Sequence, residues 1–418
     1  MVRTAGIGIM ALLALGCGDG GQGGMSGAGD PVVAGVGAVV DVGSPAGAGS
    51  GQPHLAVGRD GSLLMSWTEP GAESGDAEVR FARYRDGSWG APRVVTASPG
   101  LFVNWADFPS IIELSDGRLA VHWLQRSGQG RYAYDAYVAV SANDGETWSS
   151  PAPLHTDGTA TEHGFVSLFE HAGGLSAIWL DGRRYARGDD GGPGTEEMTL
   201  QYTTVDGSGT PAPERLVDAR VCDCCQTDAA MTAGGPIVVY RDRTETEIRD
   251  IVVSRLRNGE WTPAAPVHAD GWEIPGCPVN GPAIAASGEQ VVVAWFTAAG
   301  EVPVVRAAFS ADAGATFGEP VRIDLGDPIG RVDALILGDG SALVSWLERR
   351  REVTDVLVRR VTPGGGLSAV TTIGESSDER PSGFPRVALA GRRVFFAWTV
   401  PGDSASVHVV SGALTGTD

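Results

Sequence analysis

The sequence contains no lysine, so each of its 31 basic residues is an arginine. The 51 acidic residues outnumber them and give a formal net charge of -20. A nucleic-acid ligand needs a basic surface that neutralises phosphates, so this charge argues against a nucleic-acid partner. An acidic sugar would likewise need a local cluster of arginines, whose planar guanidinium groups bind a carboxylate with two hydrogen bonds.

Long apolar runs are also missing, and the run at residues 7–15 is too short to cross a bilayer. Together with Arg3 and the small-residue segment at 14–17 (ALGC), it has the order of a bacterial export signal. This segment resembles a lipobox, in which the cysteine is acylated. We therefore expect residues 1–17 to be a signal peptide, Cys17 to be the lipidation site, and the exported protein to be lipid-anchored to the bacterial cell envelope. An ordinary signal peptide is the alternative.

The main feature of residues 52–418 is a repeat in which a short apolar strand ends near an aromatic residue. Successive aromatic residues are between 51 and 61 residues apart. They are Trp67, Trp123, Trp179, Tyr240, Trp295, Trp346 and Trp398. One apolar segment precedes each copy and two follow, which makes four short strands per repeat. This pattern predicts an all-β protein, a β-propeller of four-stranded antiparallel blades with seven repeats.

The last repeat lacks a fourth strand because the chain ends soon after residues 407–410. Residues 18–51 are rich in glycine and alanine, a composition typical of a flexible tether. Segment 35–43 (GVGAVVDVG) is an exception, because its valines would suit a strand. We expect this segment to be a candidate ring-closing strand that covers the exposed edge of the last blade.

Two turns between the third and fourth strands of their repeats share one pattern. Residues 141–148 (SANDGETW) and 310–317 (SADAGATF) resemble the Asp box of sialidase-type propellers, and shorter forms occur at 86–89 and 258–261. Asp or Asn and Gly form the tight turn, and the hydroxyl groups satisfy its backbone. The resemblance covers residues 52–418 and implies a sialidase-like propeller with a carbohydrate ligand. The six blades of those enzymes are the alternative to the seven counted here.

The sequence departs from catalytic sialidases because it lacks their Arg-Ile-Pro motif, whose arginine binds the sugar carboxylate. The resemblance therefore identifies no arginine triad, no Tyr–Glu nucleophile pair and no acid/base Asp in this chain. A fold does not by itself specify a reaction. An exo-glycosidase and a non-catalytic propeller that binds glycan or protein both remain open, and we expect a monomer that needs no cofactor.

Topology predicts the face that carries a site. The Asp boxes lie on the face of the strand 3–4 turns, so a ligand should meet the opposite face, formed by the strand 2–3 turns and the blade entries. The candidate catalytic carboxylates there are Asp107, Glu162, Asp181, Asp242 and Glu348. The candidate substrate-binding residues are Trp105, His163, Arg183, Arg241, Arg243, Asn280 and Arg331. The alternative is that these polar residues cap strand ends and pair with each other.

Tyr134 and Asp135 are a further candidate pair, because a tyrosine beside a carboxylate can act as a glycosidase nucleophile. The alternative is an ordinary pair of residues at the start of a strand.

Four cysteines lie at the entries of the fourth and fifth repeats. They are Cys222, Cys224, Cys225 and Cys277. An exported protein meets an oxidising environment, so we expect two disulfides that link these entries, with a direct Cys224–Cys225 bond as one pairing. The alternative is a soft-metal site formed by thiolates and His163, but the spacing Cys-x-Cys-Cys matches no common zinc pattern.

Overall fold

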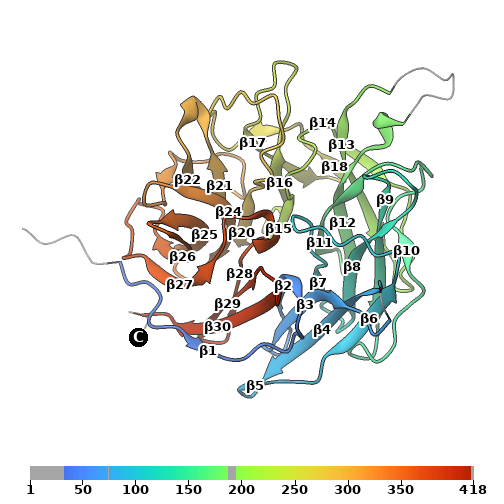
Figure 1. Ribbon diagram of the computed structural model, residues 1–418. Helices are drawn as coiled ribbons and strands as arrows, with labels where there is room; N and C mark the ends of the chain where they lie inside the picture. Colours follow the sequence, from blue (N-terminus) through green and yellow to red (C-terminus); the bar gives the residue numbers. More distant parts are fainter. Residues whose placement is uncertain (1–32, 74, 187–193, 416–418) are drawn as a thin grey trace, which may run out of the picture. The chain divides into compact units, whose positions relative to one another are not determined.

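The computed structural model describes residues 33–73, 75–186 and 194–415. The predicted signal peptide, Cys17 and the first part of the predicted tether lie outside the described residues. The strands form seven sheets arranged as the blades of a β-propeller (Figure 1). The predicted all-β fold with seven four-stranded antiparallel blades is thus confirmed, and the alternative of six blades is wrong.

Each blade runs from an inner strand to an outer one. The first blade contains β2 (Gly51–Val57), β3 (Leu63–Pro70), β4 (Ala77–Arg85), β5 (Ser88–Trp89) and β6 (Arg93–Ser98); the second contains β7 (Ile111–Glu113), β8 (Leu119–Arg126), β9 (Tyr134–Ser141) and β10 (Ala152–Pro153); the third contains β11 (His163–His171), β12 (Gly174–Asp181), β13 (Met198–Val205) and β14 (Arg215–Val221). The fourth blade contains β15 (Asp228–Thr232), β16 (Gly235–Arg241), β17 (Ile251–Arg257), β18 (Glu260–Trp261) and β19 (Ala265–Pro266), and the fifth contains β20 (Ala283–Ser287), β21 (Gln290–Thr297), β22 (Val304–Ser310) and β23 (Val321–Arg322). The sixth blade contains β24 (Pro328–Ile336), β25 (Ala342–Arg350), β26 (Val353–Val361) and β27 (Thr371–Ser376), and the seventh contains β28 (Arg386–Ala390), β29 (Arg393–Val400), β30 (Ser406–Ala413) and β1 (Val40–Asp41).

The first strand of each blade lies nearest the ring axis. These inner strands (β2, β7, β11, β15, β20, β24 and β28) contact one another in order around the ring, as Figure 1 shows. Three short 3-10 turns, η1 (Arg183–Tyr185), η2 (Ala299–Glu301) and η3 (Arg380–Ser382), are the helices of the described residues. Among these residues, no helix has the length and apolar character needed to span a membrane.

The N-terminal part of the described chain supplies the outer strand of the seventh blade. Strand β1 pairs antiparallel with β30, and Val36 forms a further bridge with Leu414. Val36 is buried, and its carbonyl oxygen accepts a hydrogen bond of 2.9 Å from Thr371 Oγ1 of the sixth blade. Both ends of the chain therefore meet in one blade, and the outer edge of β30 is covered where β1 pairs with it.

The repeated aromatic residues lie in the second strands, where each is buried. Three of them donate the indole N–H to a carboxylate two residues later: Trp67 to Glu69 at 2.7 Å, Trp179 to Asp181 at 2.9 Å and Trp346 to Glu348 at 2.6 Å. Buried indole N–H groups usually find such a partner, although that of Trp123 has none among the described residues. The carboxylate is thus part of the repeated structure of these blades.

Candidate functional site

A cleft of about 490 Å³ opens on the face of the strand 2–3 loops and blade entries. Its walls come from the β8–β9 loop, the segment that precedes β11, the β12–β13 loop and the Cys224–Cys277 pair. The turns at 141–148 and 310–317 connect third and fourth strands, so they lie at the other end of the blades. The cleft has the size of a ligand site and lies on the face that the topology predicts for one.

Glu162 lines this cleft and directly precedes β11. Its Oε1 accepts a hydrogen bond of 2.5 Å from the hydroxyl of Tyr134, the first residue of β9. Burial raises the pKa of Glu162 to about 7; the Tyr134 hydrogen bond opposes this shift, and the negative charge of Asp223 adds to it. A carboxyl group with such a pKa can give and take a proton near neutral pH.

Asp107 lies close enough to this pair to interact with it electrostatically. It is 6% exposed, and its Oδ2 accepts a hydrogen bond from the backbone N–H of Phe165. Burial raises the pKa of Asp107 to about 7, although the Phe165 bond opposes the shift, and the Glu162 carboxylate adds to it. The structure therefore brings together two of the predicted carboxylates, one at the cleft and one buried near it.

Asp223 is a second carboxylate that lines the cleft, and it was not among the sequence candidates. It accepts a hydrogen bond of 2.8 Å from the Tyr185 hydroxyl and pairs with Arg243 at 3.2 Å and with Arg249 at 3.5 Å. These two guanidinium groups lie opposite its negative charge. Its position at a blade entry could have identified Asp223 as a candidate. It lies between Cys222 and Cys224, however, and this segment was interpreted through its cysteines alone.

Aromatic and apolar side chains flank the two carboxyl groups. Tyr132 is 54% exposed and Tyr185 is 39% exposed, and Met198 forms part of the floor. An apolar lining with a few polar groups is typical of small-molecule sites. Exposed tyrosines also offer an apolar ring face with a polar tip, which suits a sugar ring.

The other predicted carboxylates do not line the cleft. Asp181 binds the Arg183 guanidinium through both oxygens at 2.7 Å, and Glu348 accepts the backbone N–H of Leu325 and of Asp327 in addition to the Trp346 indole. Asp242 accepts a hydrogen bond of 2.8 Å from the backbone N–H of Arg243, and burial raises its pKa to about 6. An acidic residue recurs two positions after Trp67, Trp179 and Trp346. This recurrence in the sequence could have indicated that Asp181 and Glu348 are structural parts of the blades.

Most of the predicted binding residues join neighbouring loops. Arg241 is 1% exposed and donates to the backbone carbonyls of Arg249, Asn280 and Phe296. Asn280 accepts the Arg331 backbone N–H at 2.6 Å and donates to the Ile329 carbonyl at 3.1 Å.

The Arg331 side chain donates to the Gly383 carbonyl at 3.2 Å and lies 4.8 Å from the centre of the Trp105 ring. Arg183 adds an ion pair with Glu214 at 3.1 Å. Among the predicted arginines, only Arg243 bonds to a side chain that lines the cleft.

Tyr134 lies beside a carboxylate, but this carboxylate is Glu162 and not the candidate partner Asp135. Consecutive residues of a strand point to opposite sides, so the two side chains cannot meet. Asp135 instead faces His155 and His163.

One of the two predicted disulfides is present, between Cys224 and Cys277. Cys222 and Cys225 are free, buried thiols whose sulfur atoms are 3.5 Å apart. The prediction of a second disulfide is therefore wrong. A direct Cys224–Cys225 bond is also wrong, because Cys224 is bonded to Cys277. The hydrogen bond between the two thiols lowers the pKa of Cys222 to about 6; burial opposes this shift, and nearby Arg241 and Arg249 add to it.

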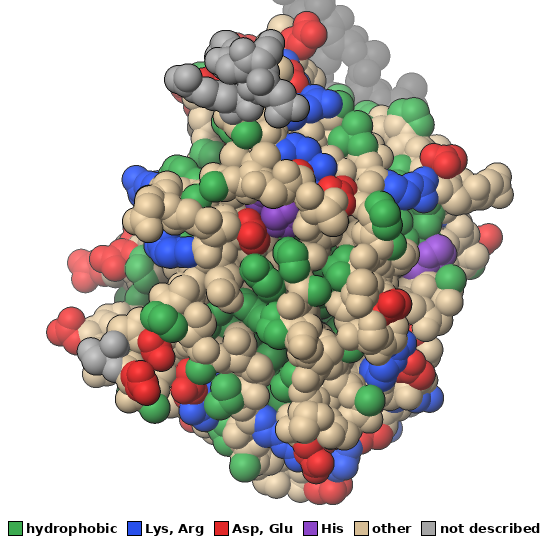
Figure 2. All heavy atoms as spheres, turned by 90° about the vertical axis from the view of Figure 1, so that its right-hand side faces the viewer, with side chains coloured by type: hydrophobic (Ala, Val, Ile, Leu, Met, Phe, Trp, Pro, Cys, Tyr) green, Lys and Arg blue, Asp and Glu red, His purple; other side chains and the backbone are tan. Residues whose placement is uncertain are grey.

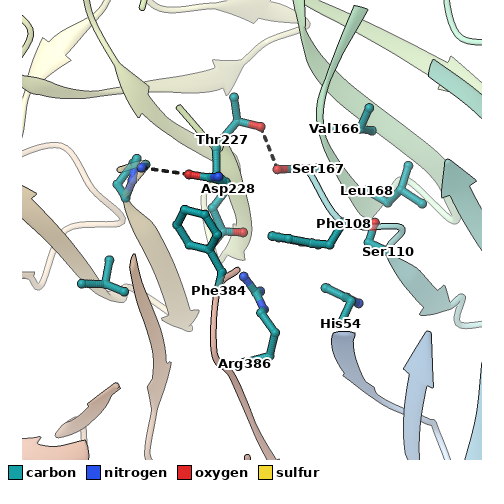
Figure 3. A pocket seen from close by; sticks show the side chains of 14 residues that line it. His54, Phe108, Ser110, Val166, Ser167, Leu168, Thr227, Asp228, Phe384 and Arg386 are labelled. Carbon is teal, nitrogen blue, oxygen red and sulfur yellow. Dashed lines mark hydrogen bonds between the residues drawn. The ribbon is translucent and has the colours of Figure 1, made fainter. Parts of the chain in front are cut away.

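A second, much smaller cavity of about 40 Å³ lies among the inner strands (Figure 3). Phe108, Phe384 and Arg386 point into it, and the Arg386 guanidinium lies 4.7 Å from the centre of the Phe108 ring and pairs with Asp333 at 3.2 Å. This volume does not admit a sugar ring, so the cleft at the blade entries is the better candidate.

Acidic and basic side chains are interspersed over the face of the molecule shown in Figure 2.

No protein-family model and no curated protein matches the sequence. Among solved structures, a protein of unknown function from Dyadobacter fermentans matches with a TM-score of 0.51 and 13% identity over 92% of this chain and 98% of that one.

The polysaccharide lyase Uly1 matches with a TM-score of 0.50 and 10% identity over 87% of this chain and 90% of that one. The NanB sialidase of Streptococcus pneumoniae has a TM-score of 0.44 and 12% identity, over 91% of this chain and 70% of that one. At these identities the first two matches show a shared fold.

Proposed function

We propose that this propeller binds a glycan in the cleft at its blade entries and cleaves it with Glu162 as the general acid. The observation that carries the proposal is a half-buried carboxyl group, with a pKa raised to about 7, that lines a cleft of ligand size beside a second, arginine-paired carboxylate. A carboxyl group that can donate a proton, beside a second carboxylate, is the arrangement that glycoside hydrolysis requires.

The chemistry follows from the contacts. Protonated Glu162 gives its proton to the glycosidic oxygen as the bond to the anomeric carbon breaks, and the bonding electrons leave with that oxygen. The Tyr134 hydroxyl, which already donates to Oε1, stabilises the carboxylate that remains. The Asp223 carboxylate, which pairs with Arg243, stabilises the positive charge on the sugar or takes a proton from the attacking water.

Two further points support a glycan as the ligand class. The fold neighbour Uly1 is a polysaccharide lyase, so polysaccharides are the first ligands to test. The export signal and the lipobox-like Cys17 would place the cleft outside the cytoplasm, where the envelope and its surroundings supply such polymers.

The test is hydrolysis of a panel of aryl glycosides and polysaccharides, sialosides included, by the wild type and by Glu162→Gln. We expect the variant to lose activity by at least about 100-fold. Because the acid must be protonated, wild-type activity should fall as the pH rises above about 7.

Glu146→Gln is the matched control, because Glu146 is exposed in a turn at the opposite end of a blade and its loss should leave the rate unchanged. Full activity of Glu162→Gln would contradict the assignment.

A second function, glycan binding without cleavage, is favoured by the exposed Tyr132 at the cleft. It predicts glycan retention on an affinity gel with no turnover, and weaker retention after Tyr132→Ala. Turnover that vanishes in Glu162→Gln would reject this alternative.

A further inference from the structure

Two histidines are stacked next to the cleft, on the other side of the strand that begins with Tyr134. The rings of His155 and His163 lie 3.6 Å apart between centroids and are tilted by only 6°. The side chain of His155 is 3% exposed and that of His163 is 0% exposed. Two buried imidazoles in such close contact cannot both be charged without a large electrostatic cost.

Carboxylates lie at both edges of this stack. On one edge, Asp135 Oδ1 is 3.5 Å from His155 Nε2 and 3.6 Å from His163 Nδ1. On the other edge, Asp157 Oδ1 is 2.6 Å from His155 Nδ1 and 3.3 Å from His163 Nε2. Asp181 lies farther out, 3.8 Å from His163 Nε2, and is neutralised by Arg183.

Several polar atoms of the cluster lack a hydrogen-bond partner. Among the described residues, Asp135 Oδ1, His155 Nε2 and His163 Nε2 are buried atoms without one. Two of them, Asp135 Oδ1 and His155 Nε2, face each other at 3.5 Å on one edge of the stack, whereas His163 Nε2 lies on the Asp157 edge. Buried polar atoms are nearly always satisfied, so the orphaned pair at Asp135 calls for a ligand. The excess of negative charge indicates that this ligand is a cation.

We propose that Asp135 Oδ1, His155 Nε2 and His163 Nδ1 bind a divalent transition-metal ion of the zinc class. Imidazole nitrogens and a carboxylate oxygen are donors that zinc accepts. Bonds of about 2.0–2.1 Å in tetrahedral geometry place neighbouring donors roughly 3.4 Å apart, close to the separations at Asp135. In the metal-free protein His163 Nδ1 donates a hydrogen bond of 3.3 Å to the Tyr134 carbonyl oxygen, so binding of the ion displaces this proton.

Asp157 supplies the outer support of this site. By accepting the Nδ1 proton of His155, it leaves the Nε2 lone pair of that ring directed at Asp135. Metal-bound histidines commonly donate their other nitrogen to a carboxylate in this way. The rings are now parallel, so their in-plane lone pairs run side by side, and one ring must turn for both donor nitrogens to point at a single ion.

The ion would join three segments: β9 through Asp135, the connection between the second and third blades through His155, and β11 through His163. Tyr134 and Glu162, the neighbours of two of these ligands in the chain, form the hydrogen-bonded pair at the cleft. The metal would therefore fix the position of Glu162 without contacting it. The site stands on its own geometry and does not depend on what the cleft cleaves.

A proton on His155 is the competing occupant. Burial opposes charging this ring, but the carboxylates of Asp135 and Asp157 outweigh that cost and raise the pKa of His155 to about 9. The two occupants can be distinguished by metal analysis. A bound metal ion stays with the protein through gel filtration and is detected there, whereas a protonated His155 leaves the protein without metal.

The experiment measures metal bound to the full-length protein after treatment with a chelator and reloading with zinc or with cobalt. All variants carry Cys222→Ser and Cys225→Ser, because free thiols also bind zinc. Mass spectrometry gives the metal content, and the cobalt absorption spectrum reports tetrahedral nitrogen and oxygen coordination. The test variants are Asp135→Asn and His155→Gln.

We call the protein that carries only Cys222→Ser and Cys225→Ser the parent, and we expect it to retain one zinc ion per chain. Each test variant should bind zinc at least about 100-fold more weakly, because even the loss of a residue that only supports a metal ligand can weaken binding by that factor. His268→Gln is the matched control: His268 also pairs with an aspartate, Asp270 at 2.8 Å, but lies in another blade. It should bind zinc like the parent.

Absence of retained zinc in the parent, or undiminished zinc in Asp135→Asn, would overturn the proposal. Zinc lost on removal of the two thiols alone would assign the metal to the cysteines and would overturn it as well. Asp135→Asn keeps the side-chain shape and decides the question if His155→Gln does not fold. Since metal content needs no turnover, this result is separate from the test of Glu162.

Discussion

Two kinds of buried carboxylate occur in this propeller, and their partners separate them. Asp181 and Glu348 receive two or more donors each, including an indole N–H, and act as fixed parts of the blades. Glu162 receives a phenolic O–H and Asp107 a backbone N–H, so burial dominates and raises both pKa values to about 7. Glu162 and Asp107 are therefore carboxyl groups that can gain or lose a proton near neutral pH.

The raised pKa of Asp107 predicts how stability depends on pH. The folded state holds this proton more tightly than the unfolded state, in which the pKa is about 4. The contribution of Asp107 is therefore fully present below about pH 4 and is lost as the pH rises through about 7. In the variant Asp107→Asn the group no longer titrates, so the free energy of unfolding should fall less steeply over this range.

Urea unfolding at several pH values measures this difference. Asp327→Asn is the control, because the Asp327 side chain is 60% exposed and should leave the pH dependence as it is in the wild type. Equal slopes for the wild type and Asp107→Asn would show that Asp107 is not protonated in the folded state.

At the scale of the element, the turns at 141–148 and 310–317 attach each blade to the blade before it. Ser141 Oγ and Ser310 Oγ each accept the N–H of a glycine at 2.9 Å, Gly145 and Gly314 respectively. Both glycines have positive φ, 78° and 75°. A Cβ at Gly314 would lie 2.1 Å from Ile237 Cδ1 in the preceding blade, so glycine is needed for conformation and for close approach.

Gly314→Ala should therefore lower the free energy of unfolding by about 1–3 kcal/mol, measured by urea denaturation. Gly259→Ala is the matched control, because Gly259 has a φ of 83° but no atom within 4 Å of an added Cβ. It should cost less, since only the backbone is strained. Equal losses would mean that the contact with Ile237 contributes nothing.

At the scale of the whole molecule, the ring depends on a blade built from both ends of the described chain. Strands β28 to β30 come from the C-terminal end, and β1 comes from residues near the N-terminal end. Arg360 of the sixth blade also donates to the Ala34 carbonyl at 3.2 Å. The seventh blade is thus held by contacts that join residues more than about 300 positions apart.

Removal of residues 1–43 should expose the edge of β30 and lower the free energy of unfolding by at least about 2 kcal/mol, through the lost burial of Val36 and its hydrogen bonds. Removal of residues 1–32, which leaves β1 and Val36 in place, is the control. Calorimetry compares the two. Equal stability of both truncated proteins would show that the seventh blade stands with three strands.

The sequence alone determined the architecture of this protein, because each blade is specified by local pattern. The apolar second strand with its aromatic residue, from Trp67 to Trp398, repeats at one period, and the Asp/Asn-Gly turns mark the ends of blades. The same reasoning identified the face of the ring that carries the cleft, since the order of strands in a blade decides which turns share a face.

Only the tertiary structure decided which polar residues meet. Glu162 pairs with Tyr134, Asp223 faces the cleft with Arg243, and His155 stacks on His163, whereas Arg241 and Asn280 join loops of the scaffold. These contacts depend on how neighbouring blades and their connecting segments pack. That packing sets distances of a few ångströms between side chains, and no local period in the chain encodes them.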